Sequence, residues 1–348
     1  MTKSVDYIIV GNGFASFFFA HQLVKNKKSF ILFSSSDKGA SQVSAGVINP
    51  VVLKKFTTFW KAKEQIDFLQ KTLAEIESYI GTNFGIDSPI HRVFHDENER
   101  NLWLKKSQNS VLNEFLDDEF KSLSIINNPH QTGQVKHSSR LDVYGFFNGL
   151  TNYFEKNDSI IDEEFVYSEL KPELNTYKNI HFKNLVFCEG IRVLKNPFFN
   201  NIPVQPNKGH HLKVKLKRDL IDNVIIKKKH FLFPLNTGWY YYGGTYDRDN
   251  VENKIDNSAV HQLSSGLSEF YPFDFEIKEV NFGFRPTVKD RKPILGSHPK
   301  FKNFYVFNGL GARGILNGCY FSQHLFDHIE YGKELYPEVN LNRFTDIF

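Results

Sequence analysis

Cysteine is scarce in this sequence, since Cys188 and Cys319 are the only two among 348 residues. Two cysteines cannot build a disulfide framework, and they are too few for a zinc site of the usual spacing. The 13 histidines form no His-x-x-x-His or Glu-x-x-His pattern in a convincing place, so we expect no metal centre. The scarcity of cysteine fits a protein of a reducing compartment.

Long apolar runs and targeting signals are also lacking. The apolar stretch from Phe14 to Ala20 ends at His21, well short of the roughly 20 residues of a membrane-spanning helix. The first residues run directly into a predicted strand, without the charged, apolar and small-residue regions of a signal peptide. We therefore expect a cytoplasmic protein with no membrane anchor.

A strong charge of one sign is lacking too, since the formal net charge is +4. Such a diffuse excess of lysine is usually a solvated surface, and an anionic partner such as RNA is the less favoured interpretation. The hydrophobic content of 41% allows a sizeable core, in one large domain or two intertwined ones.

Both ends of the sequence are typical of a parallel sheet covered by helices. Near the start, residues 7–10 and 29–33 are short apolar runs separated by a helical pattern over 15–27. Near the end, the apolar run 304–307 leads through glycines into a helical pattern that reaches about Tyr331. These segments predict an α/β fold.

The middle of the sequence mixes helical and strand-like patterns. Amphipathic helical periodicity covers 56–116 and 140–155. Strand-like runs follow at 164–169, 180–182 and 184–187. From His211 to Phe284, apolar and polar residues alternate as in antiparallel strands. The sequence therefore predicts a second, antiparallel sheet with some helices.

A glycine-rich turn joins the first predicted strand to the first predicted helix, with the sequence Gly11-Asn12-Gly13-Phe14-Ala15-Ser16. Gly11 permits the tight turn, and Gly13 lets the backbone approach a pyrophosphate at the positive end of the helix. Ser16 is small enough for the close packing of helix and strand. The turn predicts a bound dinucleotide, with a plain turn in an α/β fold as the alternative.

The end of the second predicted strand departs from the usual dinucleotide pattern. An acidic residue is expected there to bind the adenosine ribose, but the chain has Ser34-Ser35-Ser36 and only then Asp37. From these residues alone, FAD, NAD and no ligand all remain open.

Further motifs narrow this choice. They are Ser41–Pro50, Gly283–Gly296 with its Arg-Pro, Asp and Pro-Ile-x-Gly spacing, Asn308–Ile315, and the more degenerate 185–190 and 207–211. Together they resemble, in order from Val5 to about Ile329, the D-amino-acid oxidase and glycine oxidase superfamily of FAD enzymes. The resemblance implies non-covalent FAD, with adenosine diphosphate along 11–44 and the flavin ring between 45–49 and 309–315.

The resemblance implies a set of cofactor contacts, and it places a helix N-terminus at the edge of the flavin ring, where it stabilises the anionic reduced ring. The implied contacts are Gly11, Gly13, Phe14, Ala15, Ser16, Ser34, Ser35, Ser41, Ser44, Ala45, Gly46, Asn49, Phe165, Val166, Glu189, Gly190, Arg285, Gly309, Gly311, Ala312, Arg313, Gly314 and Ile315.

Arg285 is the predicted catalytic side chain, because the family's matching arginine pairs with a substrate carboxylate or lies beside it. The alternative is a structural ion pair between Arg285 and Asp290 or another core carboxylate. Tyr246 is a further candidate for the substrate site. His210 and His211 either face the substrate or sit at a strand edge, and the edge is the favoured interpretation.

The resemblance also implies two domains and an activity. The domains are a discontinuous, Rossmann-like FAD-binding domain (1–55, 140–206 and 281–348) and a substrate domain (56–139 and 207–280). The implied activity is oxidation of a C–N bond of an amino acid or other amine by hydride transfer to flavin N5. The imine then hydrolyses, and dioxygen or another acceptor reoxidises the flavin.

Two alternative functions remain open. The stretch Gly311–Gly314 and the closing residues 337–344 look more like the FAD domain of the bifunctional tRNA wobble-uridine modification enzyme than like glycine oxidase. That likeness implies demodification of a tRNA side chain, although the family's methyltransferase domain is missing. The departures at Ser34 and at Lys208-Gly209-His210 motivate the second alternative, a catalytically inactive flavin-binding scaffold.

Overall fold

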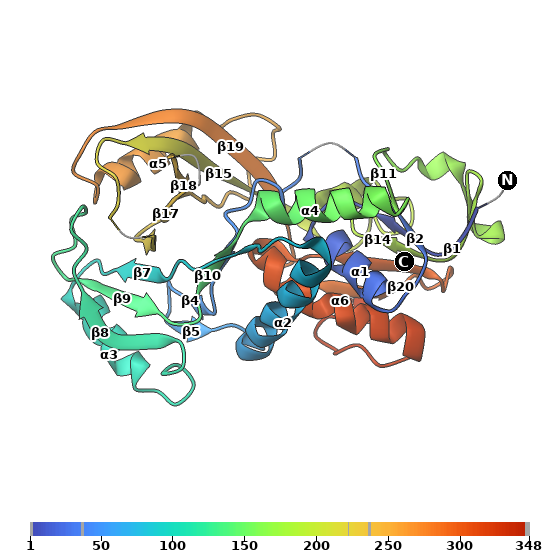
Figure 1. Ribbon diagram of the computed structural model, residues 1–348, viewed down its shortest axis with the longest axis horizontal. Coiled ribbons are helices and arrows are strands. Elements are labelled where there is room, and N and C mark those ends of the chain that lie inside the picture. The colour runs from blue at the N-terminus through green and yellow to red at the C-terminus, as the bar shows by residue number, and fades with distance from the viewer. Residues whose placement is uncertain (1–2, 36–37, 222, 236–237, 345–348) are drawn as a thin grey trace.

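Two eight-stranded sheets lie side by side in the molecule and organise the rest of the chain (Figure 1). The computed structural model describes residues 3–35, 38–221, 223–235 and 238–344. Ser36 and Asp37, at the end of the second predicted strand, lie outside these residues.

The first sheet contains the parallel strands predicted at both ends of the sequence. Parallel pairing joins β11, β2, β1, β14 and β21, and antiparallel pairing adds β20, β13 and β12. The bounds are β11 (Ile160–Ile161), β2 (Phe30–Phe33), β1 (Lys3–Val10), β14 (Ile180–Phe187), β21 (Phe304–Asn308), β20 (Ile294–Ser297), β13 (Thr176–Tyr177) and β12 (Leu170–Lys171). The strands predicted at 180–182 and 184–187 are thus one continuous strand, since β14 pairs with β1 along its length.

Helices cover one face of this sheet. They are α1 (Phe14–Lys25), α2 (Ala62–Ile80), α4 (Val143–Lys156) and α6 (Gly314–Tyr331). Helix α1 packs against α6, and α6 packs against α2, so the first and last helices of the chain are neighbours (Figure 1). The opposite face is covered by residues 193–204, whose apolar side chains form a second core with those of the strands.

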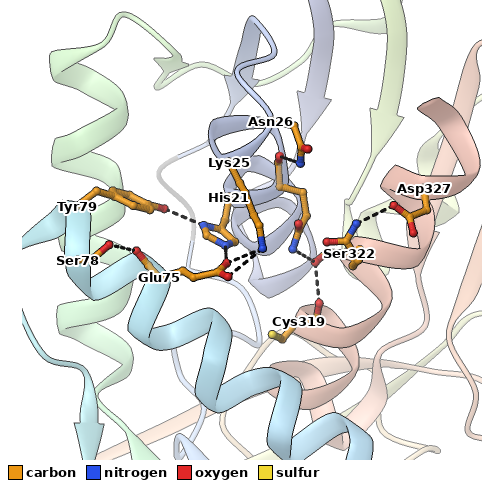
Figure 2. A network of polar contacts seen from close by, with 11 residues as sticks. His21, Lys25, Asn26, Glu75, Ser78, Tyr79, Cys319, Ser322 and Asp327 are labelled. Atoms are coloured by element: carbon orange, nitrogen blue, oxygen red, sulfur yellow. Dashed lines mark hydrogen bonds and ion pairs between the residues drawn. The ribbon is translucent and has the colours of Figure 1, made fainter. Parts of the chain in front are cut away.

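A polar network between α1, α2 and α6 fixes how these helices pack (Figure 2). His21 Nδ1 lies 3.1 Å from the Tyr79 hydroxyl, and its Nε2 lies 3.3 Å from the Glu75 carboxylate. Lys25 donates to both oxygens of the same carboxylate, at 2.9 and 2.8 Å. Burial lowers the pKa of His21 to about 4, so its ring is neutral at neutral pH.

The second sheet contains the strands predicted between His211 and Phe284. Its bounds, in order across the sheet, are β19 (Phe275–Thr287), β15 (Gln205–Leu216), β18 (Tyr240–Gly243), β17 (Phe231–Pro234), β16 (Ile225–Lys227), β7 (Ile90–Val93), β9 (Thr132–Val135) and β8 (Leu116–Lys121). Helix α5 (Asn257–Ser268), which no sequence pattern predicted, covers one face with Leu263 and Leu267. The other face packs against Val51, Phe56 and Ala45.

Short elements connect the two sheets. The small strands are β3 (Val47–Ile48), β10 (Ser139–Leu141) and β6 (Gly85–Ile86), with β4 (Val51–Val52) and β5 (Thr57–Thr58) as a separate pair. The remaining helices are α3 (Glu97–Ser107), η1 (Tyr167–Glu169), η2 (Pro172–Leu174), η3 (Gly190–Lys195), η4 (Gly311–Arg313) and η5 (Leu341–Arg343). Across the described ranges, no helix combines the length and the apolar character needed to cross a bilayer.

The helical prediction for 56–116 was wrong over much of that range. Gly81 takes a left-handed conformation with φ +78° and ends α2. The four residues Ile90–Val93 are all buried and form a strand between β16 and β9, so tertiary burial overrides the helical periodicity.

Two further local predictions were also wrong. Arg140 and Leu141 belong to a strand, because the Asp142 carboxylate caps the helix by accepting from the Gly145 N–H at 3.1 Å. Residues 164–169 form no strand, and η1 takes their place. The Val166 N–H donates to the Tyr177 hydroxyl at 3.0 Å instead of to a neighbouring strand.

The predicted domain boundaries at 206/207 and 280/281 fall within β15 and β19.

Candidate active site

The turn between β1 and α1 is tight, and it admits only glycine at its first position. Gly11 adopts φ +132°, and a Cβ there would lie 2.3 Å from the carbonyl oxygen of Cys188. A Cβ at Gly13 would lie 2.9 Å from the Ser41 hydroxyl oxygen. Ser16 is fully buried and donates to the Gly13 carbonyl oxygen at 2.8 Å. This geometry suits a backbone that must approach a pyrophosphate closely.

The loop that follows β2 folds over this turn. The Ser41 hydroxyl oxygen accepts a hydrogen bond from the Phe14 N–H at 3.2 Å, and the Gln42 amide donates to the Asn12 carbonyl oxygen. The Ser44 hydroxyl is buried, yet no atom of the described residues bonds to it. A buried hydroxyl without a partner beside a helix N-terminus fits the polar diphosphate of a dinucleotide.

The ends of β2 and β14 carry polar side chains on either side of this turn. Ser34 and Ser35 are half-buried. Arg192 donates to the Ser35 hydroxyl, and the Asn12 amide donates to the Ser35 carbonyl oxygen at 2.8 Å. Sequence reasoning missed Arg192, because no motif distinguishes an arginine that follows a strand by a few residues.

Glu189, just after β14, is a carboxylate that already has protein partners. The Tyr167 hydroxyl donates to its Oε1, and the Asn196 amide donates to its Oε2 at 2.6 Å. Burial raises the pKa of Glu189 to about 7, although these hydrogen bonds and Arg192 act in the opposite direction. The predicted contact between Glu189 and the cofactor stays a prediction.

Phe165 and Val166 lie at the far side of the same sheet. Phe165 is buried and stacks on Tyr177, with ring centres 4.0 Å apart. Val166 is 43% exposed, and its carbonyl oxygen accepts from the Glu169 N–H at 3.0 Å. The Val166 N–H is also hydrogen-bonded, to Tyr177, so only the side chain of Val166 has no protein partner. The predicted cofactor contact of Val166 stays a prediction.

The second glycine turn, between β21 and α6, lies beside the first. Gly309 and Gly311 adopt φ +71° and +61°, conformations that favour glycine. A Cβ at Gly314 would lie 3.2 Å from Cδ2 of Phe14, so α6 begins against the start of α1. The structure therefore brings the two glycine turns together from opposite ends of the chain.

Side chains around the second turn hold it in place. The Asn308 amide donates to the Gly190 carbonyl oxygen at 2.9 Å, and the Asn317 amide donates to the Leu310 carbonyl oxygen at 3.0 Å. The Arg313 guanidinium lies 4.4 Å from the ring centre of Phe59. Ile315 is buried and Ala312 is exposed.

Residues 45–49 run between the two large sheets. Gly46 adopts φ +69°, and a Cβ there would lie 2.2 Å from the Leu141 carbonyl oxygen. Ala45 and Val47 pack against the apolar cluster on the second sheet. The Asn49 side-chain oxygen accepts from the Val51 N–H at 2.9 Å.

Arg285, on β19, spreads its guanidinium over neighbouring glycines. A Cβ at Gly209 would lie 2.3 Å from both of its terminal nitrogens, and a Cβ at Gly244 would lie 3.0 Å from one of them. Nη1 donates to the Thr245 carbonyl oxygen at 2.9 Å, and the guanidinium carbon lies 4.4 Å from the ring centre of Tyr246. No Asp or Glu of the described ranges forms an ion pair with it.

The alternative ion pair between Arg285 and Asp290 was wrong. Asp290 instead accepts from Arg343 Nε at 2.9 Å. Two residues beyond Arg285, the Cγ2 atom of Thr287 lies 4.0 Å from the position of a Cβ at Gly311. The strand that carries Arg285 therefore runs close to the second glycine turn.

The strand-edge interpretation of His210 and His211 was also wrong, because β15 pairs with β18 on one side and β19 on the other. His210 Nε2 accepts from the Asp256 N–H at 3.1 Å. His211 stacks on Tyr241 with ring centres 4.5 Å apart. Burial and the nearby Arg285 cation lower the pKa of His211 to about 4, so this ring is neutral. Tyr246 is 68% exposed.

Sequence reasoning also missed Arg140, a buried arginine near this face of the sheet. Its guanidinium carbon lies 4.4 Å from the ring centre of Phe233, and Nη2 donates to the Pro234 carbonyl oxygen at 3.1 Å. Its Nε is buried and has no partner among the described residues. No motif surrounds Arg140, and the helical pattern that seemed to include it gave no reason to select it.

Comparison with known proteins extends these observations. Residues 6–327 match the DAO family, described as FAD dependent oxidoreductase. Glycine oxidase of Pseudomonas aeruginosa is 22% identical over 125 residues, which are 35% of this chain and 34% of that protein. D-amino acid dehydrogenase of Vibrio vulnificus is 25% identical over 148 residues, 41% of this chain and 35% of that protein. The chain thus spans about a third of the length of these curated relatives.

Solved structures share the fold over nearly the whole chain. Glycine oxidase from Geobacillus kaustophilus has a TM-score of 0.77 at 17% identity, covering 96% of both chains. Glycine oxidase from Bacillus cereus has a TM-score of 0.75 at 18% identity, covering 95% of this chain and 96% of that chain. The α/β fold with a parallel and an antiparallel sheet is confirmed.

Proposed function

Because the chain belongs to the family of FAD dependent oxidoreductases, we propose that it oxidises the C–N bond of an amino acid or another amine. The substrate would lose a hydride from carbon and a proton from nitrogen, and water would hydrolyse the resulting imine. Dioxygen or another acceptor would then take up the two electrons. The names of the relatives, glycine oxidase and D-amino acid dehydrogenase, support amino acids as the substrate class.

The residues of the two glycine turns fit FAD. Gly11 and Gly13 stand where any Cβ would strike neighbouring atoms, and the buried Ser44 hydroxyl has no protein partner in the described chain. We propose that residues 11–44 hold the adenosine diphosphate. The flavin ring would then lie between residues 45–49 and 309–315, as part of a discontinuous FAD-binding domain.

Bound FAD supplies the acceptor for the substrate's hydride. The protein's part is to orient the substrate and stabilise negative charge. Arg285 can bind a carboxylate through two parallel N–H groups, which fixes the position of the adjacent carbon. The N–H groups at the start of α6 favour negative charge at the ring edge. His211 is neutral beside Arg285, so it adds no competing charge.

One observation carries this proposal, namely that the Arg285 guanidinium forms no ion pair with any described carboxylate. It is held over Gly209 by the Thr245 carbonyl oxygen and by Tyr246. An arginine that merely stabilised the fold would normally have a carboxylate partner. A substrate carboxylate is the partner that the family resemblance implies.

The test is a flavin-bleaching screen of the purified protein under anaerobic conditions. Glycine, both enantiomers of the common amino acids and their N-methyl derivatives would be added separately, and the flavin absorbance would be followed. Bleaching by an amino acid supports the proposal. Failure to take up FAD would contradict it, as would bleaching by modified tRNA alone.

Reduction by dithionite but by no amine or tRNA would leave the inactive scaffold as the better account. We also propose a cytoplasmic location, because the chain has only two cysteines, and fractionation of cells would test it.

A further inference from the structure

We propose that the substrate carries a second anionic group, and that Arg140 binds it while Arg285 binds the first. The substrate class is then an amine with two carboxylates, such as a dicarboxylic amino acid. This inference rests on the proposed function and deepens it, because it names the substrate class of the same site.

The two arginines flank the segments assigned to the flavin ring. Arg140 lies in β10 and pairs directly with Val47 of β3, next to Ala45 and Gly46. Arg285 precedes Thr287, whose methyl carbon lies 4.0 Å from the position of a Cβ at Gly311. Both arginines therefore lie on strands beside the segments assigned to the flavin ring.

A row of stacked rings connects the two guanidinium groups along one face of the second sheet. The Arg140 guanidinium covers the ring of Phe233. Phe233 stacks on Tyr241 with ring centres 4.7 Å apart, and Tyr241 stacks on His211 at 4.5 Å. The position of a Cβ at Gly244 lies 3.0 Å from an Arg285 nitrogen and 3.9 Å from the Tyr241 hydroxyl.

These contacts place both cations on the same side of the sheet, because side chains of residues paired across neighbouring strands share a face. Phe233 pairs with Tyr241, His211 pairs with Gly243, and the Arg285 guanidinium occupies the space where a Gly209 side chain would point. The opposite face is occupied by α5 and its apolar contacts. Both cations therefore lie on the face that packs against Ala45 and Val47, beside the segment assigned to the flavin ring.

Arg140 lacks the partner that a buried cation requires. It is 7% exposed, and its Nε has no hydrogen-bond partner in the described part of the chain. The carboxylate closest in sequence, Asp142, is used to cap α4. Burying a guanidinium without an anion is unfavourable, and the contact with Phe233 compensates only in part. A bound anion supplies the missing compensation.

A matched arginine elsewhere shows the difference. Arg100, on α3, also covers an aromatic ring, with its guanidinium carbon 4.6 Å from the ring centre of Phe120, and its Nε also lacks a partner among the described residues. Its side chain is only half-buried, so water can solvate the cation, and α3 lies away from α1 and α6 (Figure 1). Arg100 is therefore a suitable control.

The first test compares substrates that differ only in one charge. Aspartate and asparagine, glutamate and glutamine, and iminodiacetate and its monoamide would each reduce the flavin of the holoenzyme anaerobically, with both enantiomers where they exist. We expect the acid of at least one pair to reduce the flavin about 10- to 100-fold faster than its amide. Arg140→Met should remove this preference, Arg140→Lys should keep part of it, and Arg100→Met should leave it unchanged.

A second measurement needs no turnover. Succinate and glutarate, compared with succinamate and glutaramate, would be titrated into the oxidised holoenzyme while the flavin spectrum is followed. Tighter binding of the diacids, lost in Arg140→Met, supports a site for two anions even if no amine reduces the flavin. That outcome would count against the proposed function alone.

Other outcomes overturn the inference. If amines reduce the flavin but acids and amides react and bind alike in the wild-type protein, the second anion site does not exist and the proposed function stands. If Arg140→Met slows both members of every pair equally and shifts the flavin midpoint potential, Arg140 acts on the cofactor and not on the substrate.

Discussion

Gly209 and Arg285 lie diagonally across two neighbouring strands, and the missing side chain of Gly209 makes room for the guanidinium. A Cβ at Gly209 would lie 2.3 Å from both terminal nitrogens of Arg285. We expect Gly209→Ala to keep FAD but to slow flavin reduction by substrate about 100-fold, because the guanidinium must move. Gly85→Ala is the control, since a Cβ there meets nothing within 4 Å. An unchanged rate in Gly209→Ala would contradict the assigned position of the substrate.

Removing the Arg285 cation tests the anchor itself. We expect Arg285→Met to remain yellow and to lose kcat/KM for an amino acid by about 2–5 kcal/mol, the usual effect of removing one partner of a buried charge pair. Arg285→Lys should recover only part of the loss, because it lacks the planar fork. Arg343→Met, which removes the ion pair with Asp290, is the control for general destabilisation. Comparable losses of activity in the two methionine variants would argue against an anchor.

Filling the first glycine turn should remove the cofactor. A Cβ at Gly13 already approaches the Ser41 hydroxyl to 2.9 Å, and a branched side chain would also block the pyrophosphate. We expect Gly13→Val to purify colourless, whereas Gly85→Val should bind one FAD per chain. The flavin absorbance per protein measures this, and a yellow Gly13→Val would show that the turn does not hold the cofactor.

Stability should fall as the pH drops below neutrality. Burial lowers the pKa values of His21, His211 and His230 to about 4, whereas an unfolded histidine titrates near about 6.5. Between these values the unfolded chain binds more protons than the native one, so the free energy of unfolding decreases with falling pH and is fully retained above about 6.5.

His21 provides the specific test of this pH dependence. Urea unfolding at pH 7, 5.5 and 4.5 should show a shallower decrease in His21→Gln, by at most about 1.4 kcal/mol per pH unit. Equal slopes in the variant and the wild type would mean that His21 is not buried as a neutral ring.

Both cysteines should be unreactive in the native protein. Cys188 and Cys319 are buried, and burial raises the pKa of Cys319 to about 12 and that of Cys188 well above its usual value. Since the thiolate is the reactive form, we expect no labelling by iodoacetamide at pH 7.5 and two labelled thiols in urea. Labelling of either thiol in the folded protein, detected by mass spectrometry, would contradict this burial.

The ends of the chain were predictable because their patterns are local. Residues 7–10 and 304–307 are continuous apolar runs that meet glycines, and each such run forms a buried parallel strand. The role of Gly11 in the turn was predictable from sequence, because a tight turn between strand and helix requires glycine.

The rest was not predictable because it depends on contacts between distant segments. Arg140 differs from other arginines only through Phe233 and Pro234, which come from another part of the chain. The space over Gly209 exists only once β15 pairs with β19. Residues 90–93 form a strand because they are buried between neighbouring strands, although their own periodicity predicts a helix.

The contact between Gly314 and Phe14 has a consequence for how the protein acquires its cofactor. The helix that ends the site is synthesised long after the helix that begins it, and β1 finds its partner β14 only in between. On the proposed assignment, a nascent chain that has not yet released residues 309–315 from the ribosome would have only half of its flavin site. Cofactor capture would then be a late event, and FAD would act as a ligand of the completed fold that shifts the folding equilibrium toward it.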